Sequence, residues 1–227
     1  MIGRDFLENL FAAVDNYFIE KLVEKDSIFD QILSNNQKHH LPPHDVSPSQ
    51  GKFLYLLAKI KGAKRILEIG TLGGYSTVWF AKALDADGQV ISLEYNKKHA
   101  DVAIENLMLA NVSDKTTILV GPASTHLEQM VQEQVSPFDL IFIDADKENN
   151  SVYLHYALQL SMPGTIIIGD NVVRDGAVLD AQSTDGRVIG VRSFIDDLST
   201  SAKLTSTAIE TVGVKGYDGF TISIVEK

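Results

Sequence analysis

The stretch Lys64-Arg-Ile-Leu-Glu-Ile-Gly-Thr-Leu-Gly-Gly-Tyr-Ser76 decides the fold of this chain. Its apolar residues predict a buried strand that ends at Gly70, and a helix is expected to begin at about Tyr75. A strand, a tight glycine turn and a helix form the first unit of a nucleotide-binding α/β sheet. Glycines in such a turn let backbone and ligand approach closely, because they carry no Cβ.

The spacing of these glycines bears on which nucleotide is bound. A dinucleotide-binding turn reads G-x-G-x-x-G, whereas this turn reads G-x-x-G-G and follows the acidic residue Glu68. A carboxylate there repels a pyrophosphate and suits a ligand with a cationic amino-acid tail, such as S-adenosylmethionine. A nicotinamide-dependent oxidoreductase is the less favoured alternative, and a β-turn-α packing element without a ligand also remains open.

Length and composition limit the classes of protein that fit this sequence. With 227 residues the chain suits one α/β domain, and it has no cysteine for disulfides or thiolate metal sites. No signal peptide or membrane-spanning apolar run is visible, so we expect a cytoplasmic protein without a membrane partner. The net charge of −10 and the lack of basic clusters argue against nucleic acid as a partner and favour a small-molecule substrate.

The N-terminal part of the chain has a helical pattern. Apolar residues recur at three- and four-residue steps from Phe6 to Phe18, and the pattern extends to about residue 34. We expect residues 1–45 to form a helical extension of a single domain that covers residues 1–227. The apolar stripe is suited to docking on its own domain or on a second subunit. Ser47 and Pro48 then predict the start of the helix that leads to the first strand.

The rest of the chain alternates between strand and helix patterns. Five strands separated by helices predict a doubly wound parallel sheet of the Rossmann-like type. Two further β-rich segments predict an antiparallel pair at one edge, which gives about seven strands in all. Residues 171–190 have no clear period and predict a long loop. The strands expected after the first one are 89–93, 116–120, 138–143, 165–168, 204–212 and 220–225.

Polar residues at the carboxyl ends of the expected strands are the candidates for function, because ligands of open α/β sheets bind there. Glu94 lies 24 positions after Gly70, close to the interval at which an acidic residue holds a ribose. Asp144 ends one apolar strand, and Asp170 and Asn171 end the next. Two carboxylates and an amide oxygen predict a site for a hard divalent cation.

Lys147 lies in the same loop as Asp144. A neighbouring dication would disfavour its ammonium form, so Lys147 is a candidate general base. Without a metal it would be an ordinary surface lysine paired with Asp146 or Glu148.

Four motifs together resemble the cation-dependent O-methyltransferases, a family that includes the caffeoyl-coenzyme A and catechol O-methyltransferases. They are Glu68-Ile-Gly-Thr-Leu-Gly-Gly-Tyr-Ser76, Gly121-Pro-Ala123, Phe142-Ile-Asp-Ala-Asp-Lys147 and Gly169-Asp-Asn171. The resemblance is to a bacterial-type member and runs from about Val46 to the C-terminus.

The resemblance implies a methyl transfer from S-adenosylmethionine to a hydroxyl of a catechol-like, phenolic small molecule, and a homodimer. Mg²⁺, or else Mn²⁺ or Ca²⁺, would be held by Asp144, Asp170 and Asn171, with Lys147 and Asp144 as the catalytic residues. The implied cofactor-binding residues are Val46, Glu68, Gly70, Thr71, Ser76, Glu94, Ala123, Asp144 and Asp146.

The sequence departs from the family pattern at three positions near the expected site. Glu94 stands where plant members usually have aspartate, a change that keeps the ribose acceptor. Asn150 stands where members commonly have tyrosine, and Ala145 stands where the catechol enzymes have a bulky residue. The resemblance therefore implies no contact for the side chain at position 150. A cofactor-binding protein without catalysis is the remaining alternative, but binding alone requires neither Lys147 nor a metal.

Overall fold

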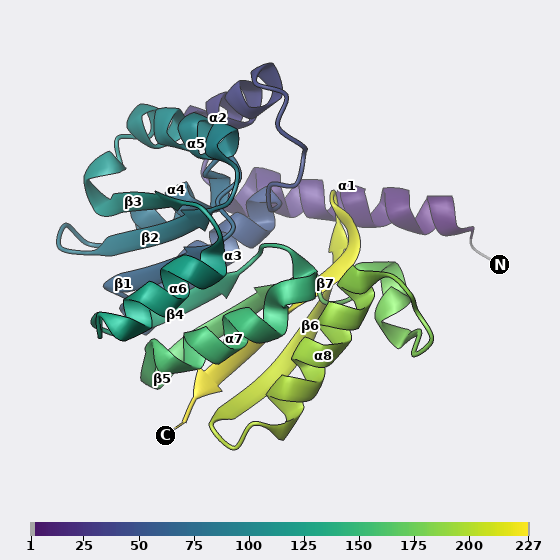
Figure 1. Ribbon diagram of the computed structural model, residues 1–227. Coiled ribbons are helices and arrows are strands. Elements are labelled where there is room, and N and C mark those ends of the chain that lie inside the picture. The colour runs from purple at the N-terminus through teal and green to yellow at the C-terminus, as the bar shows by residue number, and fades with distance from the viewer. Residues whose placement is uncertain (1–2, 227) are drawn as a thin grey trace.

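The computed structural model describes residues 3–226, which fold around one twisted sheet (Figure 1). The strands are β1 (Arg65–Ile69), β2 (Gln89–Glu94), β3 (Thr116–Val120), β4 (Phe138–Ile143), β5 (Ser161–Asp170), β6 (Leu204–Gly213) and β7 (Gly216–Val225). The helices are α1 (Arg4–Leu22), α2 (Ser27–Lys38), α3 (Pro48–Lys61), α4 (Tyr75–Ala83), α5 (Lys97–Leu109), α6 (Ala123–Gln132), α7 (Asn150–Gln159) and α8 (Gly186–Thr200). Short 3₁₀ helices are η1 (Ser113–Lys115), η2 (Lys147–Asn149) and η3 (Arg174–Leu179).

The order of the strands is β3-β2-β1-β4-β5-β7-β6, with β1 to β5 parallel and β7 antiparallel to both of its neighbours. The expected sheet, with an antiparallel pair at its C-terminal edge, is confirmed. The strand order reverses between β1 and β4, and ligands of such sheets bind beyond the carboxyl ends of the strands at that point. The glycine turn and Asp144 both lie there.

Helices cover both faces of the sheet (Figure 1). On one face, residues of α2, α3, α4 and α5 pack against side chains such as Ile66 and Phe142. On the other face, residues of α6, α7 and α8 pack against side chains such as Leu67 and Ile141. Consecutive residues of β1 therefore enter opposite cores, which explains why its apolar run is continuous and does not alternate.

The segment 171–190 is more structured than the sequence indicates. It contains η3 and the first turn of α8, so the expectation of a long loop was wrong. Glycines at 186 and 190 hide the helical pattern in the sequence. A Cβ at Gly190 would lie 2.2 Å from the carbonyl oxygen of Lys147, so this glycine lets α8 pack closely against η2. The β6–β7 connection is also tighter than expected, because Gly216–Gly219 belong to β7.

The N-terminal extension consists of two helices with different surroundings. Ile28, Phe29 and Ile32 of α2 are buried in the main core. By contrast, α1 contacts β6 and α3 and extends away from the body of the molecule (Figure 1). No helix in the described part of the chain is long and apolar enough to cross a bilayer.

Candidate active site

The glycine turn after β1 is fixed by its contact with the neighbouring strands. Gly70 has a φ of +104°, a conformation that favours glycine, and its N–H donates to the carbonyl oxygen of Leu93 at 2.9 Å. A Cβ on Gly70 would lie 2.1 Å from the carbonyl oxygen of Asp144. The first glycine of the motif is therefore required by the close approach of β1 and the loop after β4.

Glu68 lies beneath this turn and is fully buried. Its carboxylate accepts hydrogen bonds from the hydroxyls of Ser76 (2.6 Å), Ser92 (2.6 Å) and Thr77 (2.5 Å). Burial raises the pKa of Glu68 to about 7, although the three hydroxyls act in the opposite direction. The structure places this carboxylate where it braces the turn and the start of α4, and its role in binding the cofactor remains a prediction.

Three other predicted cofactor residues line the same end of the sheet. Glu94 accepts hydrogen bonds from the backbone N–H groups of Leu72 and Asn96, both at 2.8 Å, so it orders the glycine turn as well. Thr71 Oγ1 lies 2.5 Å from Ser92 Oγ. Ala123 begins α6 directly after the turn that follows β3. These residues follow or end the neighbouring strands β1, β2 and β3 and so lie at the same edge of the sheet.

Asp144 and Asp170 occupy equivalent positions at the ends of the neighbouring strands β4 and β5. Ile143 of β4 pairs with Gly169 of β5, and the residue that follows each of them is an aspartate. Lys147 is buried and donates to Asp144 Oδ1 at 2.8 Å. Asn171 has a φ of 55°, which is uncommon for a residue other than glycine. The two predicted carboxylate ligands and the predicted base are thus brought together, and Asn171 directly follows Asp170 in the chain.

Burial and the neighbouring charge of Asp144 raise the pKa of Asp170 to about 7. Lys147 and the hydrogen bonds to Asp170 oppose this shift. One buried lysine therefore faces two carboxylates, the buried Asp170 and the partly exposed Asp144. An added positive charge would stabilise the charged form of both acids.

Two polar contacts of this site were not predicted from the sequence. Gln50 in α3 donates from Nε2 to Asp170 Oδ2 at 2.8 Å. Tyr153 in α7 donates its hydroxyl to Asp146 Oδ1 at 2.5 Å. Ser47 caps α3 as expected by accepting from the Gln50 N–H, and this capping pattern gives no sign that the glutamine side chain reaches β5. The only sequence signal for the second contact is that Tyr153 lies seven positions after Asp146, in the helix that follows it.

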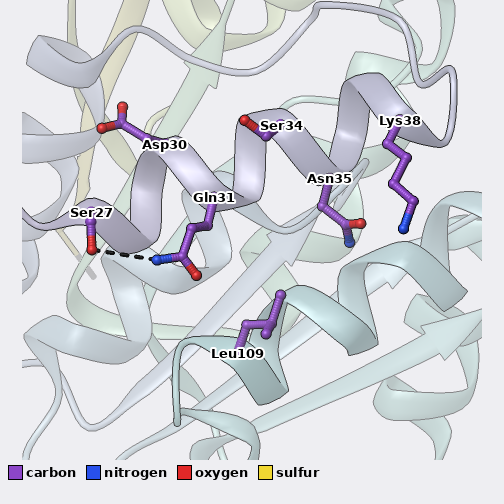
Figure 2. Close-up of a pocket in the computed structure, with 7 residues that line it drawn as sticks. All are labelled: Ser27, Asp30, Gln31, Ser34, Asn35, Lys38 and Leu109. Atoms are coloured by element: carbon purple, nitrogen blue, oxygen red, sulfur yellow. Dashed lines mark hydrogen bonds between the residues drawn. The ribbon is translucent and has the colours of Figure 1, made fainter.

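A surface cavity of about 450 Å³ lies between α2 and α5 (Figure 2). Ser27, Asn35 and Leu109 are among its lining residues, and no predicted site residue is. The cavity therefore does not mark the active site, which is recognised by its convergent polar groups.

Comparisons with known proteins agree with this geometry. Residues 19–223 match a family described as O-methyltransferase. The chain is 45% identical over 217 residues to the catechol O-methyltransferase of Niastella koreensis. The aligned region covers 96% of this chain and 98% of that protein.

Two solved structures share the fold over nearly the whole chain. The O-methyltransferase from Bacillus cereus in complex with SAH has a TM-score of 0.94 and 50% identity, with 96% of this chain and 99% of that chain covered. The O-methyltransferase TomG from Streptomyces achromogenes in complex with SAM has a TM-score of 0.93 and 40% identity, with 97% and 99% covered. The chain therefore belongs to the O-methyltransferase family and is an S-adenosylmethionine-dependent O-methyltransferase.

Proposed function

We propose that the acceptor of this methyltransferase is a catechol-like small molecule and that a divalent cation takes part in the reaction. The observation that carries the proposal is the convergence of Asp144, Asp170 and Lys147 at the ends of β4 and β5. The name of the Niastella relative supports the acceptor class.

The residues at the strand ends fit a hard divalent cation. Asp144, Asp170 and Asn171 offer only oxygen ligands if the amide oxygen of Asn171 is used, and Mg²⁺, Mn²⁺ and Ca²⁺ prefer oxygen. Asp170 is only 4% exposed, so its carboxylate is costly to bury without a positive partner. The left-handed backbone of Asn171 is a strained conformation of the kind that concentrates at ligand sites.

The chain's own residues can then carry the transfer of the methyl group. When bound, the ion supplies positive charge that favours the phenolate form of the acceptor. Lys147 accepts the phenolic proton at Nζ, and the acceptor oxygen forms a bond to the methyl carbon as the S–CH₃ bond breaks. The products are a methyl ether and S-adenosylhomocysteine (SAH). The protein contributes mainly alignment of the two reactants.

We assign the binding of S-adenosylmethionine to the edge formed by the glycine turn and the loops that face it. Gly70, Thr71 and Ser76 line the turn, Glu94 follows β2, and Asp146 is oriented by Tyr153. Val46 and Ala123 contribute from the loop before α3 and from the start of α6. Glu68 supports the turn from below by its hydroxyl contacts.

The test is methyl transfer from labelled S-adenosylmethionine to catechols and to their monohydroxy analogues, each with Mg²⁺ and with a chelator. We expect transfer to catechols that is lost in the chelator, and no transfer to the monohydroxy compounds. Turnover that persists in the chelator would rule out the metal. Turnover of monohydroxy acceptors at the same rate would rule out recognition of the vicinal hydroxyls.

We also infer that the chain is one domain that forms a homodimer through α1. Five apolar side chains of this helix are 45–68% exposed, an unusual share for a helix that does not contact another subunit. They are Phe6, Leu10, Val14, Phe18 and Leu22. By contrast, α2 shares the core of the sheet, which supports the inference of a single domain.

A further inference from the structure

Two buried asparagines connect the N-terminal helices to the glycine turn. Asn36 of α2 is 3% exposed and Asn106 of α5 is fully buried. Asn106 Nδ2 donates to both Asn36 Oδ1 and the carbonyl oxygen of Gly73, each at 2.8 Å. Asn35 Nδ2 donates to Asn106 Oδ1 at 2.9 Å, and Figure 2 shows this side chain directed from α2 toward α5. The two helices and the turn are therefore joined by one hydrogen-bonded group.

The side-chain amide of Asn36 leaves no room for a side chain at position 73. A Cβ on Gly73 would lie 2.1 Å from Asn36 Oδ1 and 2.3 Å from Nδ2. Gly73 does not have a positive φ, so its backbone would accept a side chain. The asparagine amide cannot easily move aside, because it is buried and hydrogen-bonded on both its oxygen and its nitrogen. This glycine of the motif thus accommodates α2.

Asn36 also contacts the loop that precedes α3. Its Nδ2 donates to Asp45 Oδ1 at 3.0 Å, and Asp45 directly precedes Val46. The same loop is held at Pro43, whose carbonyl oxygen accepts from Lys215 Nζ at 3.1 Å. One side chain therefore contacts both the glycine turn and the segment that carries Val46.

We propose that Asn36 and Asn106 are positioning residues for S-adenosylmethionine, which set the distance between the glycine turn and the Asp45–Val46 segment. The proposal rests on the assignment of these two segments to the cofactor under the proposed function. A core that needs only stability is served as well by apolar residues of similar volume, because a buried polar group gains little net free energy. By contrast, the hydrogen-bonded side-chain amides of Asn36 and Asn106 hold α2, α5 and the glycine turn in one arrangement.

The first test is a double-mutant cycle read by calorimetric binding of SAH, which requires neither metal nor acceptor. The four proteins are the wild type, Asn36→Ala, Gly73→Ala and the double variant. Asn36→Ala should raise the Kd for SAH about tenfold, the effect of losing about one buried hydrogen bond. Gly73→Ala should weaken binding by at least as much, because the new Cβ displaces the Asn36 amide.

The double variant separates the two explanations of Gly73. Alanine at 36 removes the three atoms that would lie nearest to the new Cβ, so the double variant should bind SAH about as well as Asn36→Ala does. If Gly73→Ala causes the same loss in both backgrounds, the glycine is needed by the cofactor itself and the proposal is overturned.

A second pair of variants separates positioning from general stability. Asn106→Ala should raise the Kd for SAH about tenfold. Leu198→Ala, a buried residue of α8 in the other core, should lower Tm while it leaves that Kd unchanged. A fall in Tm without a change in Kd for Asn106→Ala would reduce the pair to a structural role. If the wild type binds SAH but transfers no methyl group to catechols, the acceptor assignment fails and this proposal stands.

Discussion

Gln50 Nε2 donates a hydrogen bond to Asp170 Oδ2 at 2.8 Å and so connects the first turn of α3 to the end of β5. The other oxygen, Oδ1, accepts from the backbone N–H of Asn171 at 2.9 Å. Both carboxylate oxygens are thus oriented before any ligand arrives. Partners of this kind fix the direction of a metal ligand and strengthen the site.

Gln50→Ala should therefore weaken binding of Mn²⁺ or Mg²⁺ by about tenfold or more. The measurement is calorimetric titration of the metal into the protein. The affinity for SAH should remain within about twofold, since Gln50 acts on Asp170 and the change lies outside the glycine turn. Gln159→Ala, at an exposed position of α7, is the matched control and should change neither affinity. Equal metal affinity in the wild type and Gln50→Ala would contradict the assigned role.

The contact between Gln50 and Asp170 shows where sequence reasoning ends. Each strand of the sheet could be predicted, because an apolar run followed by an acidic residue or glycine is a local signal. The convergence of Asp144 with Asp170 also followed, since neighbouring parallel strands end at the same edge. Gln50 lies 120 positions from its partner, and no local pattern reports a contact over that separation.

Two further features were hidden for a different reason. The glycines of α8 reduce the helical signal, and their value appears only when Gly190 is seen against Lys147. Asn36 and Asn106 look like exposed helix residues in the sequence, because asparagine is usually found on surfaces. Their burial depends on each other and on Gly73, which is a tertiary property.

Lys147→Ala should lower kcat by about 10² or more, because it removes the group that accepts the phenolic proton. The Kd for SAH should change little, because Lys147 is not one of the residues assigned to the cofactor. Steady-state kinetics with a catechol and calorimetry with SAH supply the two readouts. Lys98→Ala, at an exposed position of α5, is the control. Unaltered kcat across the pH range would exclude Lys147 as the base.

Phe18→Glu should convert the proposed homodimer into a monomer, because a charge would be placed in the apolar surface of α1. Phe18 is 49% exposed, so the change should leave the fold of the subunit intact. Sedimentation velocity gives the mass, and circular dichroism tests the fold. Gln159→Glu adds the same charge on α7 and should leave the mass unchanged. A monomeric wild type, or a dimeric Phe18→Glu, would show that α1 does not form the interface.

The buried carboxyl of Glu68 predicts that stability depends on pH. The pKa of Glu68 is raised by burial from 4.5 to about 7. Between these two values the folded chain keeps a proton that the unfolded chain has released. The free energy of unfolding should therefore fall as pH rises through this window and level off above it. The full change for this one group is about 3 kcal/mol.

Glu68→Gln removes this proton-binding group and should flatten the dependence. Asp170 also has a pKa raised to about 7, so the wild type will show the sum of both groups. The difference between the wild type and Glu68→Gln isolates the part due to Glu68. Denaturant unfolding at steps from about pH 4.5 to 8 measures it, and that difference should change most between the two pKa values. Parallel curves for the two proteins would mean that the Glu68 carboxyl titrates alike in the folded and unfolded chains.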